Sequence, residues 1–156
     1  MHKIPTISYN DLKNTNKEVL EFLTLSLENN GFFVINNHPI DLKLISNAFQ
    51  IAEEMFNLPF DTKQKYHVPG TNGARGYTPY GIETALNEKV ADQKEFWHQG
   101  STSNIELMPN IYVDEIDNFK DLDTLYKEFE SMGVEILKAF ANFNLPYNTD
   151  IYDYAQ

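Results

Sequence analysis

Three stretches of this chain carry apolar residues at helical spacing, whereas only short stretches carry a strand pattern. The longest helical stretch covers residues 122–140, where Leu, Phe, Met and Ile recur at helical intervals over about five turns. Two or three short strands rarely form a stable sheet by themselves. We therefore expect the apolar faces of these helices and strands to be covered by a surface that they do not themselves provide.

Capping and stop residues mark the ends of the first two helices. Thr15 and Glu18 have the spacing of a capping box, and Gly31 follows the last apolar position, so a helix is predicted between them. Asp41 precedes the second helix and Pro59 ends it. The apolar residues of the second helix share one face and are Ile45, Ala48, Phe49, Ala52, Met55 and Phe56.

The strand patterns are short. Residues 4–7 contain a proline and are predicted as an edge strand. Residues 32–35 form an apolar run between turn residues, which is typical of a buried strand, and residues 94–99 are also predicted to be extended. Residues 68–81 and 100–117 are predicted to be irregular. Together the patterns predict one α+β domain over residues 1–156, with three main helices and a few short strands.

Composition excludes several classes of function. The net charge of −11, without a basic stripe, argues against nucleic-acid binding. No apolar run approaches the roughly 20 residues that span a bilayer, and the first residues lack a signal-peptide pattern. The chain has no cysteine, which excludes disulfides and thiolate metal sites. These features predict a cytoplasmic protein that binds neither membranes nor nucleic acids.

The glycine-rich loop around Arg75 is the most conspicuous local feature. Arg75 is the only arginine among twelve basic residues. A guanidinium can bind a carboxylate through two parallel hydrogen bonds, which an ammonium cannot do. Arg75 is therefore a candidate for binding a carboxylate of a ligand. The alternative is a structural role, in which Arg75 pairs with one of the many acidic side chains.

Five segments of the chain resemble, in order, the N-terminal region of the isopenicillin N synthase-like Fe(II)/2-oxoglutarate dioxygenases. Each motif is weak alone, but five in the right order are specific, and they extend over nearly the whole chain. The segments are IPTISYNDL (residues 4–12), GFFVINNHPID (31–41), FNLPFDTKQKY (56–66), ARGYTPYGIET (74–84) and ADQKEFWHQG (91–100).

The resemblance implies a catalytic part that this sequence does not contain. In that family the iron is bound on a double-stranded β-helix, a jelly-roll barrel formed by the second half of the protein, by a His-x-Asp pair and a distant His. An Arg-x-Ser binds 2-oxoglutarate. No histidine here is followed two positions later by Asp or Glu, and Arg75 is followed by Gly76 and Tyr77. The expectation is an N-terminal region whose barrel is missing.

The resemblance also implies the site residues and cofactors. In the family the arginine-glycine-tyrosine loop lies near the mouth of the barrel, so Arg75, Tyr77 and Tyr80 are candidates for contact with the prime substrate. No catalytic residue and no metal ligand is expected in this chain. Fe(II) and 2-oxoglutarate are expected only in an intact family member, with a C-terminal catalytic half as partner. Phe96 and Trp97 are expected to pack against the long helix or the missing barrel rather than to form a site.

Two functional hypotheses remain open at this point. In the first, the chain is the N-terminal scaffold and substrate-mouth region of an oxygenase that acts on a small organic molecule, and it is inactive alone. In the second, it is a standalone protein-interaction module derived from the same family. Under both, uncovered apolar surface predicts self-association, for example as a homo-oligomer, or partial disorder.

Overall fold

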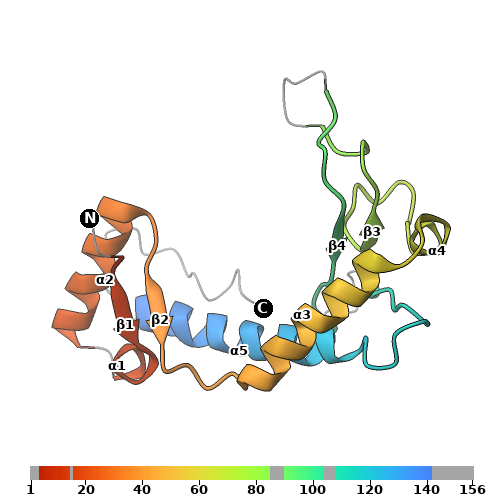
Figure 1. Ribbon diagram of the computed structural model, residues 1–156. Coiled ribbons are helices and arrows are strands. Elements are labelled where there is room, and N and C mark those ends of the chain that lie inside the picture. The colour runs from red at the N-terminus through yellow and green to blue at the C-terminus, as the bar shows by residue number, and fades with distance from the viewer. Residues whose placement is uncertain (1–3, 15, 85–89, 104–107, 142–156) are drawn as a thin grey trace. The chain divides into compact units, whose positions relative to one another are not determined.

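The computed structural model describes residues 4–14, 16–84, 90–103 and 108–141 (Figure 1). The chain divides into two compact units. Unit 1 comprises residues 1–40 and 129–156, and unit 2 comprises residues 41–128. The long helix α5 (Asp121–Ala141) begins in unit 2 and ends in unit 1. No helix in the described part of the chain is both long enough and apolar enough to cross a membrane.

Unit 1 contains a two-stranded parallel sheet joined by two helices. Strand β1 (Thr6–Ser8) pairs with β2 (Val34–Asn36), and Ile7 lies opposite Ile35. Helices α1 (Tyr9–Lys13) and α2 (Lys17–Asn30) connect the strands, as a parallel pair requires a long connection. The buried core of this unit is formed by Ile7, Tyr9, Leu12, Leu23 and Ala139.

Local signals set the ends of α2. Its N-cap is Asn16, whose side-chain oxygen accepts a hydrogen bond from the Val19 amide at 2.9 Å. Thr15, the predicted capping residue, lies outside the described residues. At the other end, Gly31 adopts a left-handed φ of 77° and its amide donates to Leu27 O at 2.9 Å. The predicted end of this helix is therefore confirmed, whereas α1 was not predicted.

The strand predicted at residues 32–35 is present, but it begins two residues later and is not fully buried. Strand β2 starts at Val34, and Phe32 and Val34 are 53% and 43% exposed. Side chains alternate between the two faces of a strand. Ile35 therefore packs on the core of unit 1, while Val34 points to the opposite, open face.

Unit 2 begins with helix α3 (Leu42–Asn57), followed by α4 (Phe60–Gln64) and an antiparallel pair, β3 (Gly76–Thr78) and β4 (Phe96–His98) (Figure 1). The predicted limits of α3 are confirmed, because Asp41 caps the Lys43 amide at 2.9 Å and the helix ends before Pro59. The α+β class, with three main helices and short strands, is likewise confirmed.

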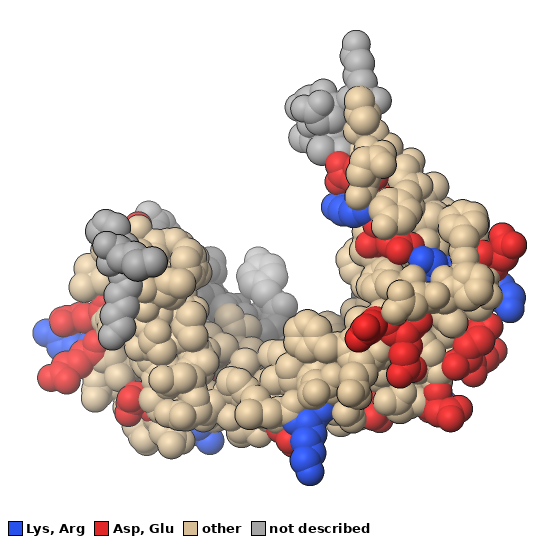
Figure 2. Space-filling model, viewed as in Figure 1, with Lys and Arg blue, Asp and Glu red and all other residues tan. Residues whose placement is uncertain are grey.

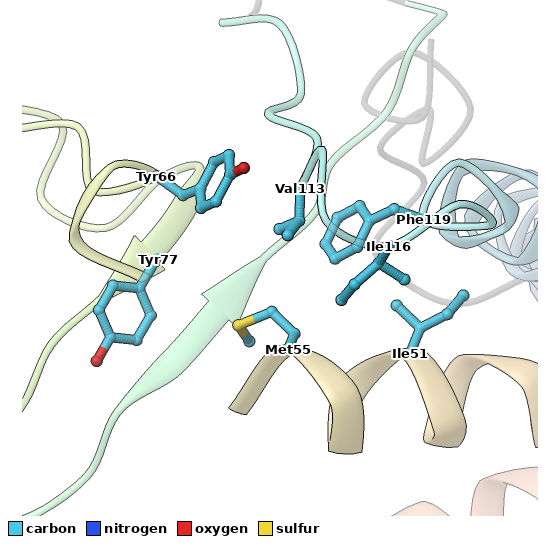
Figure 3. Packing of buried hydrophobic residues seen from close by; sticks show 7 residues of the cluster. All are labelled: Ile51, Met55, Tyr66, Tyr77, Val113, Ile116 and Phe119. Atoms are coloured by element: carbon cyan, nitrogen blue, oxygen red, sulfur yellow. The ribbon is translucent and has the colours of Figure 1, made fainter. Parts of the chain in front are cut away.

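The core of unit 2 lies between α3, β3 and the segment before α5. Figure 3 shows Ile51 and Met55 of α3 pointing toward the side chains of Val113, Ile116 and Phe119. Tyr66 and Tyr77 complete the cluster. Trp97 packs at its edge, with its ring 4.9 Å from that of Phe119. Trp97 is thus a packing residue, as expected, but its ring partners Phe119 and Tyr66 lie outside the long helix.

Two further expectations for unit 2 need correction. Strand β3 lies within residues 68–81, which were predicted to be irregular; Tyr77 pairs with Trp97 in the sheet. The buried residues of α3 are Met55, which belongs to the predicted stripe, and Ile51, which does not. Phe49, at the far edge of that stripe, is 74% exposed.

Candidate functional site

The loop that carries Arg75 depends on Gly76 at the start of β3. Gly76 has a φ of 74°, and a Cβ at this position would lie 2.5 Å from the carbonyl oxygen of Tyr66. Only glycine combines this backbone conformation with so close an approach. The amide of Tyr77 donates to the same Tyr66 carbonyl at 3.1 Å, which ties the loop to the end of the α4 region.

Only part of the Arg75 guanidinium is hydrogen-bonded within the described residues. Nη1 donates to the carbonyl of Ala74 at 2.6 Å. Nε is buried and has no hydrogen-bond partner. Within the described residues Arg75 forms no ion pair with a carboxylate. Arg75 is partly exposed, so a guanidinium able to bind a carboxylate with two hydrogen bonds has no carboxylate partner among the described residues.

Gly100 provides the surface on which this guanidinium lies. A Cβ at Gly100 would lie 2.1 Å from Nη2 and 2.2 Å from Cζ of Arg75. Its backbone is held from both sides by Asn110. The amide of Gly100 donates to Asn110 Oδ1 at 2.8 Å, and its carbonyl accepts from Asn110 Nδ2 at 2.8 Å.

Asp123, in the first turn of α5, connects these residues to the helix. Its Oδ1 accepts hydrogen bonds from Gln99 Nε2 at 2.5 Å and from Asn110 Nδ2 at 2.9 Å. Its Oδ2 accepts from the hydroxyl of Tyr112 at 2.6 Å. The hydrogen bond to Asp123, together with burial and the carboxylate charge, raises the pKa of Tyr112 to about 12. Asp123 thus accepts three side-chain hydrogen bonds.

The three predicted site residues differ in exposure. Arg75 is partly exposed and Tyr80 is 56% exposed, but Tyr77 is fully buried. The hydroxyl of Tyr77 donates to Glu95, and burial followed by this hydrogen bond raises the Tyr77 pKa above its ordinary value.

The polar residues Asp92, Glu95 and His98 do not converge on a common point. Asp92 pairs with Lys94 at 3.1 Å, Glu95 pairs with Lys63, and His98 Nδ1 contacts the carbonyl of Gly73. Among the described residues, no group of three or more His, Asp or Glu could hold a metal ion. The facial triad that Fe(II) requires does not fit the residues described.

Comparison with known proteins assigns this chain to a family. Residues 4–115 match the family described as non-haem dioxygenase in morphine synthesis N-terminal. The chain belongs to this family. It is 25% identical over 134 residues to a 2-oxoglutarate-dependent dioxygenase of Acremonium sp, covering 78% of this chain and 40% of that protein. It is 26% identical to a 1-aminocyclopropane-1-carboxylate oxidase of Dictyostelium discoideum, covering 94% and 44%.

Two solved structures share the fold of this chain. A putative 2OG-Fe(II) oxygenase family protein from Caulobacter crescentus superposes with a TM-score of 0.73 at 31% identity, covering 91% of this chain and 48% of that one. A full-length Neurospora crassa protein in complex with alpha-KG gives a TM-score of 0.73 at 21% identity, covering 97% and 51%. The chain therefore spans about half the length of the relatives it matches.

Arg75 could be recognised as a candidate from the sequence, whereas the residues that support its loop could not. Lys63, Asn110 and Asp123 were not singled out, because each acts through a partner at least ten positions away. The sequence signal for Arg75 was its composition, as a lone arginine in a glycine-rich loop. No comparable local signal marks Asn110 or Asp123.

Proposed function

We propose that this chain forms the N-terminal scaffold and substrate-mouth region of an Fe(II)/2-oxoglutarate-dependent oxygenase that acts on a small organic substrate. The match of residues 4–115 to the N-terminal family carries the proposal. The coverage of 40–51% of the relatives named above supports it. In this proposal the catalytic barrel lies in a C-terminal half outside these residues, and the chain alone is inactive.

Fe(II) and 2-oxoglutarate belong to that C-terminal half in the proposed enzyme. When bound, they would supply the oxidising chemistry. The described residues do not offer the ligand set, so no step of the reaction is assigned to them. Their proposed contribution is to bind and orient the substrate.

Arg75 and Tyr80 are the proposed contacts to the prime substrate. The guanidinium of the partly exposed Arg75 suits a carboxylate, and the exposed phenol of Tyr80 can donate or accept a hydrogen bond. Tyr77 supports the same loop from inside through Glu95. Acidic side chains dominate the charged surface of unit 2 in the view of Figure 2. An anionic substrate would therefore be held by specific contacts rather than by general attraction.

The direct test is an assay of the purified chain with Fe(II), 2-oxoglutarate and a panel of small organic acids. We expect no succinate release above the rate without protein. A full-length relative, such as the Caulobacter crescentus protein, serves as the reference for assay conditions. Sustained succinate release by the 156-residue chain would contradict the proposal.

The alternative function is that of a protein-interaction module. Under both proposals, exposed apolar residues of unit 1 favour a partner that covers them. Ile4, Phe32 and Val34 are 51%, 53% and 43% exposed. They belong to the β1–β2 part of unit 1, in which Thr6 lies opposite Val34. We propose that a C-terminal half covers this surface in the intact enzyme, and that the isolated chain self-associates. Light scattering that shows only monomer at high concentration would contradict this part of the proposal.

A further inference from the structure

We propose that Asn110 and Asp123 are positioning residues that fix the guanidinium of Arg75 against Gly100 and thereby determine where it can meet a carboxylate of the ligand. The inference rests on the proposed role of Arg75 as a carboxylate-binding residue. It adds the residues that determine where that guanidinium lies. None of them touches the ligand in this proposal.

The first step is the contact between Arg75 and Gly100. A methyl group on Gly100 would overlap both Nη2 and Cζ, at 2.1 and 2.2 Å. The guanidinium therefore occupies the space that any other residue would need for its side chain. Nη1 is held by the Ala74 carbonyl at 2.6 Å. The hydrogen bond from Nη1 and the contact of the other end of the group with Gly100 together restrict where the guanidinium can lie.

Asn110 holds the backbone of Gly100 through two hydrogen bonds. Asn110 is 9% exposed and bonds both the amide and the carbonyl of Gly100, at 2.8 Å each. A glycine has no side chain to anchor it and has the largest backbone freedom of any residue. The amide of Asn110 supplies that anchor, so the position of Gly100 depends on the orientation of Asn110.

The third step is the orientation of Asn110 by Asp123. Asp123 Oδ1 accepts from Asn110 Nδ2 at 2.9 Å, which determines that Oδ1 of Asn110 faces the Gly100 amide. The same oxygen accepts from Gln99 at 2.5 Å, next to Gly100 in the chain. Buried polar networks of this kind hold their members rigidly when every group is satisfied. Asp123 thereby connects helix α5 to Arg75 through Asn110 and Gly100.

The buried Nε shows how closely the guanidinium is packed. Arg75 Nε has no hydrogen-bond partner, while the network around Gly100, against which the guanidinium lies, is fully bonded. A Cβ at Gly100 would also lie 2.7 Å from Nε, so Gly100 lies against the Nε–Nη2 side of the group. Because Arg75 is only partly exposed, a ligand carboxylate can reach it only at its exposed part, and this packing sets where that part lies.

The test uses the single arginine of the chain as its own probe. In a ¹⁵N-labelled sample only Arg75 gives an arginine Nε–H resonance, and only Trp97 gives an indole resonance. The solvent-exchange rate of Arg75 Nε–H measures how firmly the guanidinium is held. A titration with sodium acetate, against sodium chloride at equal ionic strength, measures carboxylate binding separately.

We expect Asn110→Ala and Asp123→Asn each to speed exchange of Arg75 Nε–H by about tenfold and to weaken the acetate-dependent shift by roughly fivefold. Gly100→Ala, which displaces the guanidinium directly, should do the same. Tyr112→Phe removes a hydrogen bond to the other carboxylate oxygen of Asp123 and should change neither value by more than about twofold. The Trp97 indole resonance reports in each variant whether the core of unit 2 is intact.

The outcomes separate the two proposals. If acetate shifts the wild-type resonance but Asn110→Ala, Asp123→Asn and Gly100→Ala leave exchange and shift unchanged, the positioning inference is wrong and the carboxylate role of Arg75 stands. If the wild type shows no acetate-dependent shift, the carboxylate role is overturned, and with it the inference that rests on that role. Should Asn110→Ala lose the Trp97 resonance, Gly100→Ala and Asp123→Asn decide the matter.

Discussion

Lys63 Nζ donates hydrogen bonds to both carboxylate oxygens of Glu95, at 3.0 and 2.9 Å, and the two side chains are only 9% and 13% exposed. A third bond runs from Lys63 to the carbonyl of Phe56 at 2.9 Å, and the Tyr77 hydroxyl completes the shell of Glu95. The pair joins α4 to the segment before β4, and through Tyr77 it contacts the strand that follows Arg75. It therefore supports the candidate site from within unit 2.

Removing one partner of this pair should be strongly destabilising. Lys63→Met leaves the Glu95 charge buried, and Glu95→Gln leaves the Lys63 charge without its carboxylate. We expect each to lower the free energy of unfolding by about 3 kcal/mol. The double variant should lose clearly less than the sum of the two. Urea unfolding followed by the fluorescence of Trp97, the only tryptophan, measures all three.

The control is the exposed pair of Lys94 and Glu83 in the same unit. Their atoms lie 2.6 Å apart, but the side chains are 52% and 49% exposed. Exposed pairs contribute about 0–1 kcal/mol, so Glu83→Gln should change stability little. Equal losses in Glu83→Gln and Glu95→Gln would contradict the buried role of Lys63 and Glu95.

The same carboxylate should make unit 2 sensitive to acid. Burial alone would raise the pKa of Glu95, but the hydrogen bonds from Tyr77 and Lys63 and the lysine charge hold it below its ordinary 4.5. A carboxyl whose pKa is lower in the folded state stabilises the fold above its unfolded pKa, and this contribution is lost as pH falls through the folded pKa. Stability should therefore be level near neutral pH and fall below about pH 4.5.

The measurement is the free energy of unfolding at a series of pH values between neutral and strongly acidic. Glu95→Gln should show a shallower fall than the wild type in the acid range, because it cannot take up the proton. The pKa of Glu115 is also lowered, first by the Tyr66 hydrogen bond, so some acid dependence should remain in the variant. Parallel curves for the two proteins would show that Glu95 does not titrate in this way.

Gly76 and Gly81 offer a matched test of the loop. Both have a left-handed φ, of 74° and 78°. A Cβ on Gly76 would lie 2.5 Å from a backbone carbonyl, whereas nothing lies within 4 Å of a Cβ on Gly81. We expect Gly81→Ala to cost about 1–2 kcal/mol for its conformation alone. Gly76→Ala should cost clearly more, since the clash is added, and similar losses in both would contradict the close approach.

The first helix of unit 2 provides a test of capping. Asp41 accepts a hydrogen bond from the Lys43 amide at 2.9 Å, whereas α4 has no side-chain cap at Pro59. Asp41→Ala should therefore lose about 1 kcal/mol and Asp41→Asn much less. Asp61→Ala, which removes an acidic residue from the first turn of α4, should change stability by only about 0.5 kcal/mol. Urea titration of the three variants compares them directly.

The helices could be predicted because their signals are local. The ends of α3 follow from Asp41 and Pro59, and the end of α2 follows from Gly31. Strand β3 was missed because it exists only through its pairing with β4, about twenty positions away. The apolar run at 32–35 likewise indicates a strand but not which of its faces is covered. That depends on contacts that the run itself does not contain.

The candidate site shows the same difference between residues with a local sequence signal and residues that depend on distant partners. Arg75 stands out in the sequence, because a lone arginine among lysines is a compositional signal. The side chains that hold it do not, since the bond from Asn110 to Asp123 spans thirteen positions and Asn110 reaches Gly100 across ten. Tyr77 shares a motif with Arg75, yet its pairing in β3 places its side chain in the core. Only the folded chain shows that neighbours in a motif have separate roles.

The open face of the β1–β2 sheet gives the last prediction. Phe32 and Val34 are exposed, whereas Ile35 packs on the core of unit 1. The double change Phe32→Ser and Val34→Thr should reduce concentration-dependent association in light scattering and leave the melting temperature nearly unchanged, because no core contact is lost. Ile35→Thr, one position along the same strand, should instead lower the melting temperature. If the double variant associates as strongly as the wild type, association proceeds through another surface, and the proposed covering of this face by a C-terminal half loses its support.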